Sequence, residues 1–129
     1  PARVHGGSAF GPKPRKYELK LNKKVKTLAR KSALSMKVIA DSFKVLNDFS
    51  MDSIKTKDLH SILKKLDVSD KKILIITNNI DNNFLLSSRN LRNVNLVNVD
   101  SFSTYDIINS GYLLIDKNSV DFLNKKLMK

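Results

Sequence analysis

The sequence predicts an α/β fold, in which an open, mostly parallel sheet is flanked by helices in Rossmann-like layers and preceded by a basic extended N-terminal arm. Three observations lead to this prediction. Short β-type apolar runs alternate with helical segments after residue 40, glycine and proline interrupt the first 22 residues, and basic residues concentrate in the first third of the chain. Alternation of strands and helices about every 20 residues is typical of βαβ units.

The glycines and prolines near the N-terminus predict an arm over residues 1–22. Gly6, Gly7 and Gly11 favour unusual backbone angles, while Pro12 and Pro14 remove hydrogen-bond donors and keep the residue before each of them extended. A helix or a central strand does not tolerate so many glycines and prolines in so short a stretch. The arm has few apolar residues, so we expect it to be either disordered alone or held by a partner.

A basic amphipathic helix is expected over residues 23–40, where the globular domain (23–129) begins. Spacings of three and four residues place one set of mostly apolar or small side chains on a common face, which we expect to join the core: Val25, Leu28, Ala29, Ser32, Ala33, Met36 and Ile39. The opposite face is predicted to carry Lys23, Lys24, Lys26, Arg30, Lys31 and Lys37.

The rest of the chain supplies the alternating elements. Residues 43–48, 72–78, 94–99 and 112–116 read as strands, and two of these runs are apolar enough to be covered on both faces. Residues 56–66, 83–91, 103–109 and 119–128 read as helices, the third of them with Ser103 as its N-cap.

Length and composition restrict the classes of function. The chain has 129 residues, which suits one domain with a buried core, and no stretch approaches the roughly 18 consecutive apolar residues of a membrane span. Cysteine is absent, which excludes disulfides, thiolate zinc ligands and cysteine nucleophiles.

The net charge is +12, and it is unevenly distributed. Residues 1–37 hold 11 lysines and arginines against a single acid, Glu18, so their net charge is +10, whereas residues 38–129 carry only +2. Such concentration indicates a surface for a polyanion or an anionic membrane. The helix at 23–40 offers no aromatic anchor opposite its lysines, which disfavours the membrane.

An enzyme finds little support in the motifs. Neither a glycine-rich phosphate loop nor a GxSxG nucleophile turn occurs, and the two histidines, His5 and His60, have no partners at a spacing that suits a metal site or a catalytic triad. Asp, Asn and Ser after the strands are ordinary turn and cap residues. We expect no cofactor, metal or small-molecule substrate, although an α/β enzyme or ligand-binding domain using the crevice at the strand ends remains the alternative.

Nucleic acid is the partner that the basic arm and helix favour. Lys and Arg neutralise phosphates, His5 can touch a phosphate, and Phe10 and Tyr17 can stack on bases unless they pack against the domain. Two arginines near residue 90 are weaker candidates. The predicted RNA-binding residues are Arg3, His5, Phe10, Lys13, Arg15, Lys16, Tyr17, Lys20, Lys23, Lys24, Lys26, Arg30, Lys31, Arg89 and Arg92.

Two stretches make the sequence similar to a known family. The run GGSAFGPKPR over residues 6–15 with Tyr17, and the run LSSRNL over residues 86–91 with Asn93-Val94, resemble the L-four family of bacterial large-subunit ribosomal proteins. The sequence departs from the family pattern at Asn22 and Ile54, where proline is frequent, and at Ser88, where alanine is common. It also begins on the returning limb of the family's extended loop, so we expect a fragment.

The resemblance implies a function in translation. It implies an α/β domain on the outside of the large ribosomal subunit in the cytoplasm, bound to large-subunit ribosomal RNA and neighbouring ribosomal proteins. It further implies a loop that helps to line the peptide exit tunnel, and a role early in subunit assembly.

Overall fold

The computed structural model describes residues 4–7, 10–47 and 49–128. The helices are α1 (Lys23–Ile39), α2 (Thr56–Lys65), α3 (Asn82–Ser88), α4 (Thr104–Asn109) and α5 (Lys117–Leu127), and the strands are β1 (Phe43–Leu46), β2 (Ile73–Thr77), β3 (Val94–Asn98) and β4 (Tyr112–Asp116). Every predicted element forms in the predicted order, with ends that differ by three residues or fewer. Asp48, which was expected to end the first strand, lies outside the described residues.

The strands form one parallel sheet with the order β1-β4-β2-β3. Leu74 of β2 is aligned with Leu113 of β4 on one side and with Asn95 of β3 on the other. All five residues of each central strand, β2 and β4, are buried. Their side chains are covered on both faces of the sheet, which explains why these sequences are almost continuously apolar. The predicted α/β fold class is confirmed.

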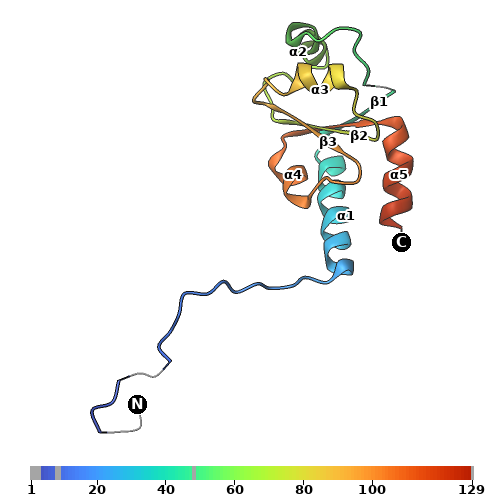
Figure 1. Ribbon diagram of the computed structural model, residues 1–129. Helices are drawn as coiled ribbons and strands as arrows, with labels where there is room; N and C mark the ends of the chain where they lie inside the picture. The colour runs from blue at the N-terminus through green and yellow to red at the C-terminus, as the bar shows by residue number, and fades with distance from the viewer. Residues whose placement is uncertain (1–3, 8–9, 48, 129) are drawn as a thin grey trace.

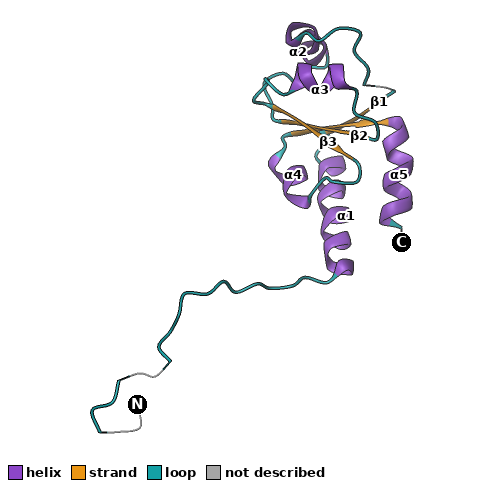
Figure 2. Ribbon diagram, viewed as in Figure 1, coloured by secondary structure: helices purple, strands orange, loops and turns teal. Residues whose placement is uncertain are grey.

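Helices cover both faces of the sheet (Figures 1 and 2). On one face lie α2 and α3, and on the other lie α1, α4 and α5. Successive side chains of a strand therefore enter different cores: Leu74 and Ile76 pack with α1, α4 and α5, while Ile73 and Ile75 pack with α2 and α3. The chain changes face after β3, so the neighbouring strands β2 and β4 lead into helices on opposite faces.

The predicted core face of α1 is wrong. Ala33 is buried, with an exposed fraction of 4%, but Leu28 is 66% exposed, and Val25, Met36 and Ile39 are exposed too. The side that meets the domain instead carries Arg30, Ala33, Leu34 and Lys37, which follow the spacing of one helical stripe.

Two long basic side chains explain this reversal. The Arg30 guanidinium lies 5.4 Å from the centre of the Phe102 ring, and the Lys37 ammonium donates a hydrogen bond to the Ser110 carbonyl. Both residues lay their aliphatic stems along the domain while their charged ends find a partner. Small Ala33 lets the helix approach between them. A pattern that counts every charged residue as outward-facing misses this arrangement.

The predicted cap of α4 is confirmed. The Ser103 hydroxyl accepts a hydrogen bond from the Asp106 backbone N–H at 3.2 Å, and the Asp106 carboxylate accepts one from the Ser103 backbone N–H at 2.8 Å. This reciprocal pair satisfies two donors that a helix start otherwise leaves without partners.

Candidate nucleic-acid interface

An exposed basic segment precedes the first helix. Residues 4–7 and 10–22 contain no helix or strand, and all of them are exposed. Figure 1 shows this part of the chain leaving the start of α1 and extending away from the domain. Pro12 and Pro14 keep their neighbours extended and donate no backbone hydrogen bond, which accounts for the lack of regular structure. Lys13, Arg15, Lys16 and Lys20 are therefore presented to solvent on every side.

The aromatic residues of this segment are not packed against the domain. The Phe10 side chain is 95% exposed, and Tyr17 is exposed as well. The Arg15 guanidinium carbon lies 4.6 Å from the centre of the Tyr17 ring, a distance typical of a cation–π contact. A planar cation and an aromatic ring held together in solvent offer two surfaces on which a nucleobase can stack.

The basic surface continues onto the first three turns of α1. Lys23, Lys24, Lys26 and Lys31 are exposed, and the helix contains no acidic residue. A groove of about 440 Å³ lies between this end of α1 and the end of α5, with Leu28 and Leu127 among its lining residues and Lys23, Lys24 and Lys31 beside them. Arg30 does not belong to this surface, because it is half-buried against the domain.

Comparison with known proteins identifies the family. A family model described as "Ribosomal protein L4/L1 family" matches residues 1–126. The chain belongs to the ribosomal protein L4/L1 family. It is 48% identical over 120 residues to large ribosomal subunit protein uL4 of Cytophaga hutchinsonii, an alignment that covers 93% of this chain and 58% of that protein. It is 45% identical over 128 residues to uL4 of Bacteroides thetaiotaomicron, covering 99% and 62% of the two chains.

The chain spans about three fifths of the length of these uL4 relatives. The expected resemblance to the L-four family is confirmed, as is the expectation that the chain is a fragment relative to its relatives. These relatives are named as large ribosomal subunit proteins.

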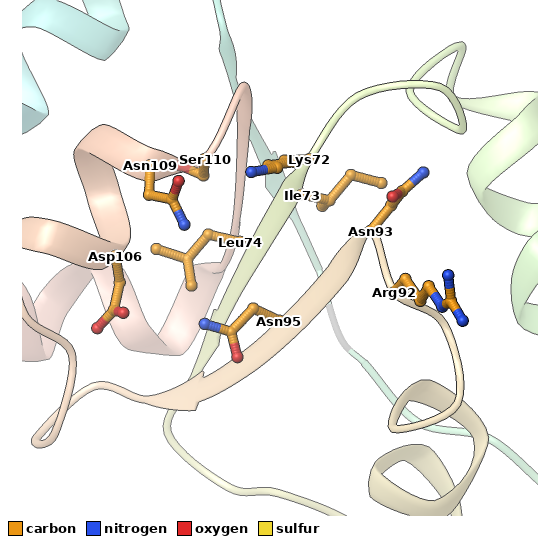
Figure 3. A pocket seen from close by; sticks show the side chains of 9 residues that line it. All are labelled: Lys72, Ile73, Leu74, Arg92, Asn93, Asn95, Asp106, Asn109 and Ser110. Carbon is orange, nitrogen blue, oxygen red and sulfur yellow. The ribbon is translucent and has the colours of Figure 1, made fainter.

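Two of the other predicted RNA-binding residues of this L4/L1 chain, Arg89 and Arg92, lie apart from the basic segment. Arg89 and Arg92 are exposed near the start of β3, next to the sheet. Figure 3 shows Arg92 on one side of a hollow of about 150 Å³ and Asp106 and Asn109 of α4 on the other. His5 is exposed with a left-handed φ of 74°, and Arg3 lies outside the described residues.

The crevice required by the alternative function does exist. It lies where β2 and β4 end, has a volume of about 370 Å³ and is open to solvent; its lining residues are Asn78, Asn79, Asp116, Asn118, Asp121, Phe122 and Lys125. None of these is a histidine, serine or cysteine, and the described residues contain no cluster of three or more His, Asp or Glu side chains that could hold a metal ion. The crevice therefore lacks the hydroxyl, thiol or imidazole groups of a Ser–His or Cys–His catalytic pair.

None of the helices in the described ranges combines the length and the apolarity that crossing a membrane requires.

Proposed function

We propose that this chain is part of a structural protein of the large ribosomal subunit in the cytoplasm, and that it binds large-subunit ribosomal RNA through the basic segment and the start of α1. The observation that carries the proposal is the series of eight exposed cations between Lys13 and Lys31 in a member of the L4/L1 family. That series consists of Lys13, Arg15, Lys16, Lys20, Lys23, Lys24, Lys26 and Lys31.

Binding is driven mainly by phosphate neutralisation. Each lysine or arginine that reaches a phosphate releases counterions, and the arginine can also donate two parallel hydrogen bonds. An extended backbone of 13 residues, from 10 to 22, reaches at most about 47 Å. The segment can thus follow an RNA groove that the folded domain is too wide to enter. Phe10 and Tyr17 add stacking on unpaired bases, and Arg89 and Arg92 add contacts to a separate stretch of RNA.

The family resemblance supports two finer parts of the proposal. The basic segment, as the returning limb of an extended loop, contributes to the wall of the peptide exit tunnel. Its early contact with RNA helps the subunit to assemble, with other ribosomal proteins as neighbours. A narrow, exposed, cationic strand suits both tasks because it can lie between RNA helices without displacing them.

A charge-matched pair of variants tests RNA binding by the segment. Replacing Lys13, Arg15, Lys16 and Lys20 by Gln removes four cations from the segment. Replacing Lys55, Lys57, Lys64 and Lys65 by Gln removes four exposed cations from α2 and the residue before it. Affinity for large-subunit ribosomal RNA, measured by filter binding at fixed salt, should fall at least tenfold more in the first variant than in the second. Equal losses would mean that only total charge matters.

A further inference from the structure

We propose that the crevice at the carboxyl ends of β2 and β4 is a docking site for an arginine side chain from a basic segment of a neighbouring protein. In a molecule with a net charge of +12, this hollow has two carboxylates, Asp116 and Asp121, against one ammonium, Lys125. The ribosomal setting proposed above suggests where such a partner would come from, but the site itself is argued from its own geometry.

The topology creates the crevice. β2 and β4 are neighbours in the sheet, and the chain leaves β2 towards α3 on one face and β4 towards α5 on the other. In parallel α/β sheets, the gap opened by such a divergence is the place where ligands bind. Here Asn78 and Asn79 form the wall that follows β2, and α5 forms the wall that follows β4.

One stripe of α5 faces this gap. Asn118, Asp121, Phe122 and Lys125 are spaced three and four residues apart, so they share a helix face, and all four line the crevice. Phe122 is 50% exposed, so part of its side chain is open to a ligand that enters the crevice. Asp121 stands next to it in the sequence and is exposed.

The chemistry of this stripe suits a guanidinium. The face of an aromatic ring attracts a planar cation, and a carboxylate beside it can accept two parallel N–H donors. Asp116, which is 4% exposed, adds negative charge where α5 begins, although it also accepts a hydrogen bond from the Asn118 backbone N–H at 3.4 Å. The Asn78 and Asn79 side chains can accept any remaining donor.

Asp121 is available to a partner. In the described part of the chain, the one ion pair joins Lys126 to Asp100 at 2.7 Å, and Lys125 forms no ion pair with Asp121 despite the i,i+4 spacing. An incoming guanidinium would therefore compete with no existing ion pair of Asp121. The same carboxylates repel RNA phosphates, which makes a basic protein segment the better match for this site.

The test is a titration of the whole chain with an acetylated Gly-Arg-Gly-Arg-Gly peptide. Binding is monitored by the changes in the NMR chemical shifts of the Asn78, Asn79 and Asn118 side-chain amides. We expect shifts confined to the crevice, and none with a peptide in which neutral citrulline replaces arginine. Asp121→Asn should weaken binding about threefold to tenfold. Phe122→Leu, which keeps the site apolar, should weaken it about twofold to fivefold. Asp70→Asn, which removes an exposed carboxylate before β2, should leave the affinity unchanged.

Lys125→Gln separates a cationic ligand from a nucleic acid. Removing this ammonium should strengthen arginine-peptide binding, whereas it would weaken binding of an oligonucleotide. The proposal is overturned if the peptide produces no local shifts, if Asp70→Asn acts like Asp121→Asn, or if oligouridylate occupies the crevice instead. Ribosomal RNA binding by Asp121→Asn should stay at the wild-type level, so a failure here is distinguishable from a failure of the proposed RNA-binding function.

Discussion

Two aspartates adopt a backbone conformation that glycine adopts more easily. Asp41 and Asp67 have φ values of 48° and 59°, and each follows the end of a helix. After α2, the Val68 and Asp67 backbone N–H groups donate to the Leu63 and Lys64 carbonyls at 3.2 and 3.0 Å, which is the pattern of a Schellman motif. The left-handed conformation costs a residue with a Cβ about 1–2 kcal/mol, and a carboxylate at a helix C-terminus also opposes the helix dipole.

Asp67→Gly should therefore stabilise the protein. We expect the free energy of unfolding to rise by about 0.5–1 kcal/mol, because the relief of strain exceeds the extra entropy of glycine in the unfolded chain. Urea denaturation of the whole chain measures it. Asp70→Gly, which replaces an aspartate whose own φ is not positive, should be neutral or destabilising. A gain of equal size at Asp70 would show that loss of negative charge, and not backbone conformation, is responsible.

At the scale of the element, α1 has its mostly apolar stripe outside and a mixed stripe inside. Leu28→Asp should thus change the free energy of unfolding by less than about 0.5 kcal/mol, as at other exposed positions. Ala33→Asp places an unpaired charge in the core beside Leu34 and should cost about 3 kcal/mol or more. Comparison of the two urea midpoints decides the facing of the helix. A larger loss from Leu28→Asp would restore the facing that periodicity alone predicts.

Alanine substitutions at the neighbouring residues Arg30 and Lys31 should affect different properties, namely stability at Arg30 and RNA affinity at Lys31. Arg30→Ala removes the contact with Phe102 and is expected to cost about 1 kcal/mol of stability with little effect on RNA affinity. Lys31→Ala removes an exposed cation and should weaken RNA binding while leaving the urea midpoint unchanged. Measuring both properties for both variants checks this division, which fails if Arg30→Ala leaves stability intact and impairs RNA binding.

Much of the secondary structure follows from the sequence, whereas the packing does not. The apolar runs of β2 and β4 predict buried strands because only a doubly covered strand tolerates them. The order β1-β4-β2-β3 depends on long-range pairing that no local pattern encodes. The facing of α1 was missed because the Arg30 and Lys37 stems pack against the domain. The exposure of the cations in the basic segment could be predicted, because that segment has few apolar residues that could bury them.

In the molecule as a whole, most of the net positive charge and most of the hydrophobic core lie in different parts of the chain. The first 37 residues carry +10 and the remaining 92 only +2, while both hydrophobic cores lie almost entirely beyond residue 37. We therefore propose that the domain serves as an anchor with its own polar crevice, and that the basic segment with the start of α1 is the contact for RNA.

The salt dependence of RNA binding tests this account most directly. If six to eight of the exposed cations reach phosphates, a plot of log K against log salt should have a slope of roughly −4 to −7 for the whole chain. Removing four cations at Lys13, Arg15, Lys16 and Lys20 should reduce the magnitude of that slope by about 3, and the α2 control should leave it unchanged. Equal slopes for the wild-type chain and the segment variant would contradict the account, because the phosphate contacts would then lie in the globular domain.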